Sequence, residues 1–292
     1  MSLAIVVVIL NLIGLTMLPN LIIIGAMKCG TTSLHHYLDL HPEVSMSKRK
    51  ELNFFTEKKY RKGIEWYSSH FTKDSKVVGE SSPNYTNSAK FTGVPKRMHA
   101  LIPGAKLIYL VRDPIKRMIA HYTHQYSCSL EDRTIDEALT NPIDNLYLDR
   151  SLYCKQISLF LDYFDIDQIM ILSAECLRYE RGKALRNVFE FLEVDAKFTT
   201  NKFNRQRHVT SYKRRKNNMG KAISKSFVSN GMKLLPKQYR HILETAIYWP
   251  FSEPVGEFKL SEKAHRTVQA LLAKDVGQFR KITRQSFSHW GV

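Results

Sequence analysis

The 292-residue sequence predicts an α/β fold in which a central parallel sheet is flanked by helices on both faces. The prediction depends on three segments in which a short aliphatic run is followed by apolar residues at helical spacing. Alternation of strands and helices is typical of parallel sheets, because the chain crosses a face of the sheet between neighbouring strands. Such sheets bind ligands at the carboxyl ends of their strands.

The first strand and helix begin after Pro19. The run from Leu21 to Ile24 ends at Gly25 and is typical of a buried strand. A helix is expected from Thr31, because a Ser/Thr start precedes apolar residues at helical spacing. These apolar residues are Leu34, Tyr37 and Leu38. The glycine-containing segment between strand and helix is therefore predicted to be a loop.

Two further units follow the same pattern. The second has a strand at Lys106 to Val111 and an amphipathic helix at Ile115 to Tyr126. The third has a strand at Gln168 to Leu172 and a helix at Ala184 to Leu192. A last helix is expected from Ser261 to Arg284.

The sequence between these units contains no interdomain linker and no internal repeat. Glu51 to Phe71 is rich in aromatic residues and lysine, and Gly79 to Tyr85 (GESSPNY) is expected to form a turn. The length is ample for one large core. We therefore expect one domain over residues 19–292.

Residues 1–18 form an apolar leader. The segment from Leu3 to Leu18 is 16 residues long and apolar except for Asn11, Gly14 and Thr16. A membrane-spanning helix needs about 20 residues. No Lys or Arg precedes the segment, and it has no convincing cleavage site for a secretory signal. We expect either a leader packed on the domain or a start placed too early, with a membrane anchor as the alternative.

Positive charge is concentrated in the last third of the chain. The net charge is +17, and the segment from Asn201 to Val292 has 19 Lys and Arg against 5 Asp and Glu. Such an excess favours anionic partners, which include nucleic acid, phosphorylated or sulfated small molecules and acidic glycans. A hydrophobic content of 43% excludes a disordered chain.

The four cysteines show neither a CxxC pair nor a histidine at ligand spacing. We therefore predict no zinc site and no disulfide framework, and we expect a reducing, cytoplasmic location with membrane anchoring as the alternative. Cys29 lies beside Lys28 and could be considered a nucleophile. No histidine or acid lies next to it in the sequence, so we interpret it as a loop residue.

The loop from Gly25 to Ser33 has the glycine spacing of a P-loop, which predicts a P-loop-like domain. Thr31 occupies the position of the usual lysine, and the lysine is instead Lys28. A strand-to-helix loop presents backbone N–H groups and a helix N-terminus to an anion. The displaced lysine argues against an ordinary ATPase or kinase loop, and a plain turn with an exposed lysine is the alternative.

Five segments have motifs that occur together in one enzyme family. They are LIIIGAMKCGTTSL from Leu21, KELNFFTEKKYRKGIEWY from Lys50, GESSPNY from Gly79, LIYLVRDPIKRMIAHYTH from Leu107 and KDVGQFRKITRQSFSHW from Lys274. Together they resemble the sulfotransferases that use 3′-phosphoadenosine 5′-phosphosulfate (PAPS), and in particular the heparan sulfate N- and 3-O-sulfotransferase group. The resemblance extends over nearly the whole chain and implies PAPS as co-substrate, without a metal.

The resemblance implies a role for each matching residue. Lys28 would neutralise charge on the leaving phosphate, Glu51 would be the base that takes the acceptor's proton, and His124 would lie near the acceptor. His35, His36 and His121 are rival bases. The residues expected to bind the nucleotide are Lys28, Cys29, Gly30, Thr31, Thr32, Ser33, Arg112, Tyr212, Lys213, Arg214 and Arg215.

Within this set, Arg112 would grip the 3′-phosphate, with an ion pair to Asp113 as the alternative. Tyr212 would cover the adenine, and the three basic residues that follow it would reach the 3′-phosphate. A solvated basic surface is the alternative for that segment.

The chain departs from the family pattern at two positions. Ala120 occupies the place of a serine that follows the arginine by eight residues, so a neighbour such as Thr123 would have to supply that hydrogen bond. Ser81 occupies the place where the heparan sulfate group has lysine, which bears on the acceptor rather than on PAPS.

The leading hypothesis is transfer of a sulfuryl group from PAPS to a hydroxyl or amine, most simply on a carbohydrate. The enzymatic alternative is a P-loop nucleotide kinase or other phosphotransferase, which the missing GK[ST] lysine disfavours. A non-catalytic polyanion-binding relative is the alternative from another class. We expect no nucleic-acid partner, whereas membrane contact through residues 1–18 stays open.

Overall fold

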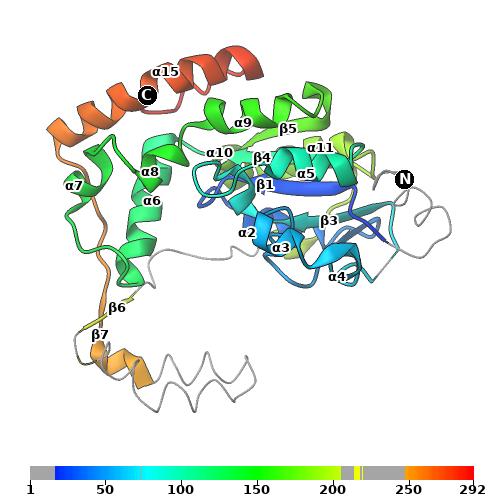
Figure 1. The fold of residues 1–292 in the computed structure, drawn as a ribbon, viewed down its shortest axis with the longest axis horizontal. Coiled ribbons are helices and arrows are strands. Elements are labelled where there is room, and N and C mark those ends of the chain that lie inside the picture. Colours follow the sequence, from blue (N-terminus) through cyan, green and yellow to red (C-terminus); the bar gives the residue numbers. More distant parts are fainter. Residues whose placement is uncertain (1–16, 73, 205–213, 218, 220–246) are drawn as a thin grey trace.

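The structure is a computed structural model that describes residues 17–72, 74–204, 214–217, 219 and 247–292 (Figure 1). Its centre is a five-stranded sheet in the order β2-β3-β1-β4-β5, and every pair of neighbouring strands is parallel. The strands are β1 (Leu21–Gly25), β2 (Val44–Met46), β3 (Val77–Ser81), β4 (Lys106–Val111) and β5 (Ile169–Ser173). The predicted parallel α/β sheet is confirmed.

Two strands were not expected from the sequence. β2 has only three residues, which is too short for a periodicity signal. β3 overlaps the segment predicted to be a turn, because that segment contains typical turn residues such as Gly79, Ser81 and Pro83. All five residues of β3 are nevertheless buried, and a Cβ on Gly79 would lie 2.8 Å from Met46 Sδ. Close packing between neighbouring strands therefore decides the conformation here.

The α-helices of the described residues cover both faces of the sheet. They are α2 (Thr31–Leu38), α3 (Glu57–Tyr60), α4 (Gly63–Ser68), α5 (Val94–Leu101), α6 (Pro114–Ser127), α7 (Ile135–Thr140), α8 (Leu146–Asp149), α9 (Tyr153–Leu161), α10 (Ala174–Tyr179), α11 (Arg181–Phe191) and α15 (Glu262–Thr283). The crossover from β1 runs toward β2, whereas those from β3 and β4 run toward β5. Because such crossovers are right-handed, opposite directions place helices on opposite faces.

The last helix packs on the helices that follow β4. Figure 1 shows α15 lying across α9, and Asp275 of α15 accepts the backbone N–H groups of Cys154 and Lys155 at 3.0 and 2.9 Å. These N–H groups lie in the first turn of α9, where no carbonyl of the helix can reach them. The carboxylate therefore caps α9 from a position far along the chain.

A short antiparallel ribbon was not predicted. It pairs β6 (Arg214–Lys216) with β7 (Ser252–Pro254), and it lies near the C-terminal end of α6 (Figure 1). Each basic residue of β6 lies over an aromatic ring, at 3.4 to 4.1 Å from the ring centroid. Within the described residues, none of the helices has the length and apolar character needed to cross a membrane.

Candidate functional site

The loop between β1 and α2 needs its two glycines. A Cβ on Gly25 would lie 2.0 Å from Thr86 Oγ1, which is much closer than two non-bonded heavy atoms can approach. Gly30 precedes α2 with a φ of 97°, in the left-handed region that favours glycine. Thus Gly25 allows the loop to pass close to the segment after β3, and Gly30 turns the chain into the helix.

Some backbone N–H groups of this loop already have acceptors in the protein. The N–H of Cys29 donates to Ala26 O at 3.2 Å, and the N–H of Ser33 donates to Gly30 O at 3.0 Å. Among the described residues, the backbone N–H groups of Gly30, Thr31 and Thr32 have no protein acceptor. The N–H groups of Cys29 and Ser33 are thus used by the tight turn and the first helical turn, and the roles of these two residues in anion binding stay predictions. The free groups form the helix N-terminus, where anions bind favourably.

The Cys29 thiol is not a nucleophile. Its side chain is only 1% exposed, and burial raises the pKa of the thiol to about 11. The sulfur lies 3.7 Å from the Tyr153 hydroxyl. A thiol with this pKa is almost entirely protonated at neutral pH, so the interpretation of Cys29 as a loop residue agrees with its surroundings.

The loop lies at the point where the order of the sheet reverses. The connections of the adjacent strands β1 and β4 leave in opposite directions, which opens a crevice at the carboxyl ends of these strands. Arg112 directly follows β4 on the other side of this crevice. The Tyr153 hydroxyl donates to Arg112 O at 2.8 Å and accepts from Arg112 N at 3.3 Å. Because the same hydroxyl also contacts Cys29, Tyr153 holds the two sides of the crevice together.

The expected alternative partner of Arg112 is engaged elsewhere. Asp113 caps α6 by accepting the Lys116 N–H at 3.0 Å, and its second oxygen accepts the Gly291 N–H at 2.9 Å. Within the described residues, the half-buried Arg112 guanidinium has no ion pair. It is thus available to an anionic ligand.

Two buried arginines lie near this crevice. Arg117 is fully buried and donates to Ser151 Oγ at 2.6 Å and to Tyr147 O at 2.5 Å. Arg150 is 7% exposed and donates to Asn84 Oδ1 at 2.8 Å. Neither forms an ion pair with a carboxylate of the described residues, although buried charges are normally paired.

These arginines create a strongly positive interior. Burial lowers the pKa of Arg150 to about 10, so the guanidinium stays charged at neutral pH. Burial, reinforced by the charges of Arg117, Arg150 and Lys28, holds the pKa of the His121 imidazole far below its usual range. His121 is therefore neutral, and its Nδ1 has no partner among the described residues. An anionic ligand would supply the missing counter-charge.

The predicted base lies on the segment that follows β2. The Glu51 side chain is 34% exposed, and Lys50 Nζ lies 3.4 Å from its Oε1. Burial lowers the pKa of Lys50, whereas the neighbouring Glu51 carboxylate raises it. The charge of the Glu51 carboxylate also raises the pKa of Arg150, against the larger lowering by burial. Its role as base stays a prediction.

The rival histidines have different surroundings. His35 Nδ1 lies 2.9 Å from Ser81 Oγ, and burial together with the charge of Lys50 lowers the pKa of His35 to about 4. His35 is therefore neutral and joins α2 to the position where the heparan sulfate group has lysine. His124 is half-buried one turn beyond His121, with Cys128 Sγ 3.9 Å from its Nδ1. Its proximity to an acceptor stays a prediction.

The Thr123 hydroxyl does not take the place of the serine hydroxyl that is missing at position 120. It donates to Ile119 O at 2.7 Å within α6, and the Thr123 side chain is 6% exposed. The hydroxyl proton is thus already used in the helix.

The two predicted nucleotide-closing residues that the structure describes, Arg214 and Arg215, lie away from the crevice. Tyr212 and Lys213 lie outside the described residues. Arg215 stacks on Tyr126 and pairs with Asp132, and Arg214 stacks on the ring of Trp249 and bonds to Ser252. Tyr126 lies at the far end of α6, about 20 Å from Arg112 at 1.5 Å per residue. In this arrangement neither Arg214 nor Arg215 reaches a phosphate at Arg112, because aromatic partners hold both on the ribbon.

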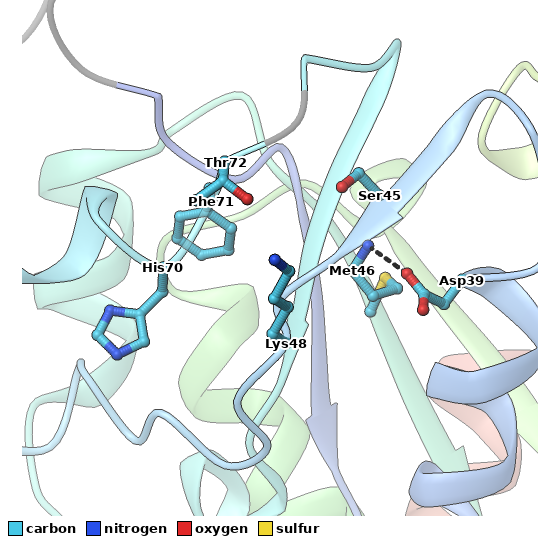
Figure 2. A pocket seen from close by; sticks show the side chains of 7 residues that line it. All are labelled: Asp39, Ser45, Met46, Lys48, His70, Phe71 and Thr72. Atoms are coloured by element: carbon cyan, nitrogen blue, oxygen red, sulfur yellow. Dashed lines mark hydrogen bonds between the residues drawn. The ribbon is translucent and has the colours of Figure 1, made fainter.

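A separate hollow lies beside the outer strand β2, and Figure 2 shows the Lys48 ammonium directed into it. The hollow is lined by Asp39, Ser45, Met46, Lys48, His70, Phe71 and Thr72. The Asp39 carboxylate is turned to the backbone, where it accepts the Met46 N–H at 3.1 Å. Because β3 lies between β2 and β1, this hollow is distinct from the crevice at β1 and β4.

Comparison with known proteins identifies the family. A family model described as the sulfotransferase domain matches residues 18–239. The chain belongs to the sulfotransferase domain family. This confirms the resemblance found in the five sequence motifs.

The sulfotransferase domain has relatives of known name. The bifunctional heparan sulfate N-deacetylase/N-sulfotransferase 4 of Mus musculus is 32% identical over 198 residues, which are 61% of this chain and 22% of that protein. The membrane-associated sulfotransferase kil1 of Dictyostelium discoideum is 40% identical over 110 residues, which are 36% of this chain and 22% of that protein. The chain thus spans less than a quarter of the length of these curated relatives.

A solved structure has the same fold as this sulfotransferase domain. The crystal structure of a sulfotransferase from Alicyclobacillus acidocaldarius matches with a TM-score of 0.68 and 21% sequence identity, and the match covers 94% of this chain and 99% of that chain. At this identity the likeness establishes the α/β fold.

The sequence interpretation did not single out Arg150 and Tyr153 as candidate site residues. Both lie in a stretch of mixed polarity around α8 and α9 that matches no short motif. Arg150 is distinguished by a buried charge that has no ion pair with a carboxylate among the described residues. Tyr153 is distinguished by a hydroxyl that contacts both sides of the crevice. Both properties appear only once the chain is folded.

Proposed function

We propose that this protein transfers the sulfuryl group of PAPS to a hydroxyl or amine acceptor. The observation that carries the proposal is the crevice between β1 and β4, where a helix N-terminus faces Arg112 and the neighbouring buried arginines have no carboxylate. A ligand with phosphates at both ends of a ribose would satisfy the two sides of this crevice. A bidentate guanidinium suits the 3′-phosphate, and the helix N-terminus suits the 5′-phosphate.

The proposed reaction is an in-line displacement at sulfur. The acceptor oxygen or nitrogen forms a bond to sulfur while the bond from sulfur to the 5′-phosphate oxygen breaks, and adenosine 3′,5′-bisphosphate (PAP) leaves with the negative charge. The Lys28 ammonium and the N–H groups of Gly30 to Thr32 stabilise that charge. Glu51 takes the acceptor's proton, and His124 is the further candidate near the acceptor.

The acceptor is proposed to be a carbohydrate. Relatives named as heparan sulfate N-sulfotransferases support this class, and the excess of basic residues suits an acidic glycan. De-N-sulfated heparan sulfate oligosaccharides therefore serve as the first probe acceptor, with a neutral glucoside to distinguish hydroxyl from amine acceptors.

Nucleotide binding is tested by calorimetric titration with PAP, with ATP as the control ligand. We expect micromolar binding of PAP, much weaker binding of ATP, and loss of affinity in Lys28→Ala. Binding that favours ATP would overturn the proposal in favour of a phosphotransferase. Glu51→Gln should bind PAP normally but abolish release of PAP from PAPS in the presence of the probe acceptor.

One observation favours a second candidate, a polyanion-binding relative without turnover. Ala120 removes a hydroxyl from the 3′-phosphate side, and the Thr123 hydroxyl is used within α6. Binding of heparan sulfate that weakens steeply with salt, without PAP binding, would support this candidate.

We also propose a cytoplasmic location, with anchoring through residues 1–18 as the alternative. The cysteine pattern supports the first, and the name of the Dictyostelium relative supports the second. Fractionation of cells that express the full chain, compared with a variant that lacks residues 1–18, distinguishes them.

A further inference from the structure

One carboxylate outside the proposed reaction is fully buried in β3. Glu80 has no exposed surface, and three hydroxyls donate to it. Tyr67 and Tyr85 donate to its Oε1 at 3.0 and 2.5 Å, and Ser82 donates to its Oε2 at 2.6 Å. A buried carboxylate with three donors is a specific arrangement, because an unsatisfied charge in the interior is costly.

Two of these hydroxyls also bind the segment that carries Glu51. The Asn53 N–H donates to Ser82 Oγ at 2.9 Å, and the Phe55 N–H donates to Tyr85 Oη at 3.4 Å. Each hydroxyl therefore accepts from the segment's backbone and donates to Glu80. The segment from Lys50 to Phe55 lies outside every helix and strand, so these contacts replace hydrogen bonds that regular structure would supply.

The third hydroxyl provides an internal comparison. Tyr67 lies on α4 and donates to the same oxygen of Glu80 as Tyr85 does. No hydrogen bond from the segment's backbone to the Tyr67 hydroxyl is found among the described residues. Its ring stacks on Phe54 with centroids 4.0 Å apart, and a phenylalanine ring would keep this contact. Tyr67 thus shares the contact with the carboxylate but not the backbone anchor.

The chemistry explains why position 80 carries a carboxylate. Burial raises the pKa of Glu80, and the hydrogen bonds from Ser82, Tyr85 and Tyr67 act against that rise because they stabilise the ionised form. In the ionised form both oxygens are acceptors, so all three hydroxyls can donate to the carboxylate at the same time. Each hydroxyl then presents its lone pairs to a backbone N–H. A glutamine would direct an NH₂ donor at one or more of these hydroxyls, and the proton of such a hydroxyl would lose its acceptor at position 80.

We propose that Glu80 is a positioning residue for sulfuryl transfer, which acts through the Ser82 and Tyr85 hydroxyls to fix the backbone on which Glu51 lies. This inference rests on the proposed function of Glu51 as the base. Fixing two N–H groups within four residues of Glu51 limits where its carboxylate can lie relative to the Lys28 loop. Displacement of a reacting group by about 1 Å can cost about 100-fold in rate.

The test compares Ser82→Ala and Tyr85→Phe with Tyr67→Phe as the matched control. Amide hydrogen exchange of a peptide that covers residues 51–55 reports the anchors directly, without an acceptor. We expect faster exchange in Ser82→Ala and Tyr85→Phe and unchanged exchange in Tyr67→Phe. PAP affinity, measured by calorimetry, should stay within about twofold of wild type in all three, because none contacts the nucleotide crevice.

Turnover with the oligosaccharide probe supplies the second readout. We expect kcat to fall about 10- to 100-fold in Ser82→Ala and Tyr85→Phe, with little change in the KM for PAPS, and to stay near wild type in Tyr67→Phe. Glu80→Gln should resemble the first two variants, and Glu80→Asp should recover part of kcat because it restores an acceptor-only group.

Two results would overturn the inference. One is exchange of the 51–55 amides that does not differ between the two anchor variants and Tyr67→Phe. The other is faster exchange without any fall in kcat. A wild-type level of kcat in Glu51→Gln would instead overturn the proposed base, and absence of PAP binding would overturn the proposed function, so these failures are distinguishable.

Discussion

Replacing Arg112 with alanine should weaken PAP binding without changing the stability of the free protein. The guanidinium follows β4 at the crevice and has no ion pair among the described residues. Only its backbone groups are bonded, to the Tyr153 hydroxyl. Removing the side chain thus breaks no contact that the unliganded fold uses.

The size of the effect follows from the exposure of the side chain. Hydrogen bonds to charged groups contribute about 1.5 to 3 kcal/mol each. Because Arg112 is only half-buried, water competes for it, and we take the lower part of that range. About 1.5 to 2 kcal/mol corresponds to a loss of about 10- to 30-fold in PAP affinity. The free energy of unfolding should change by less than about 0.5 kcal/mol.

Lys116→Ala is the matched control. It removes one positive charge from the exposed side of α6, four residues beyond Arg112. Calorimetric titration with PAP at physiological salt, together with urea unfolding of the free proteins, measures both quantities. An equal loss of affinity in the two variants would refute direct contact, because it would assign the effect of Arg112 to long-range electrostatics. A large loss of stability in Arg112→Ala would refute the reading of its side chain as free of structural contacts.

Three further predictions concern local chemistry. Gly25→Ala should destabilise the protein by about 1 to 3 kcal/mol in urea unfolding, because its Cβ would overlap the Thr86 hydroxyl. Burial lowers the pKa of His35 to about 4, whereas an unfolded imidazole titrates near pH 6.5. The neutral His35 therefore contributes fully to stability above about pH 6.5, and this contribution is lost as the pH falls toward 4. Between these pH values the free energy of unfolding should decrease with falling pH more steeply in wild type than in His35→Gln. The difference in slope should be at most about 1.4 kcal/mol per pH unit. Mass spectrometry after treatment with iodoacetamide at pH 8 should show modification of the exposed Cys128 and protection of Cys29, which is buried with a pKa of about 11; rapid modification of folded Cys29 would contradict the structure.

The sequence was most informative where residues act with their neighbours along the chain. The aliphatic runs at Leu21 and Lys106 predicted two of the three central strands, and the glycine spacing after Leu21 predicted the loop between β1 and α2. These signals are local, because burial of both faces of a strand appears as a continuous apolar run. β3 has a weaker signal because the polar Glu80 interrupts its apolar run. Glu80 can be buried because three hydroxyls donate to it, an arrangement that the folded chain creates.

The candidate site shows the same limit. Arg112 was recognised because it follows a predicted strand directly. The uncompensated charge of Arg150 depends on which side chains are absent around it, and a linear pattern does not contain that information. The sequence did not predict that the Arg215 guanidinium stacks on Tyr126, because this ring lies on α6, remote in sequence.

The contacts of Tyr153 with both sides of the crevice have a consequence for synthesis of the chain. The N-terminus of α9 is capped by Asp275, and the Tyr153 ring packs against Phe279 and Trp290 with centroids 5.7 Å apart in each pair. During synthesis the glycine loop and Arg112 therefore leave the ribosome long before Asp275, Phe279 and Trp290, which hold α9 and Tyr153 in place. The contacts that hold Tyr153 in place should therefore be complete only after residues 275–290 have left the ribosome.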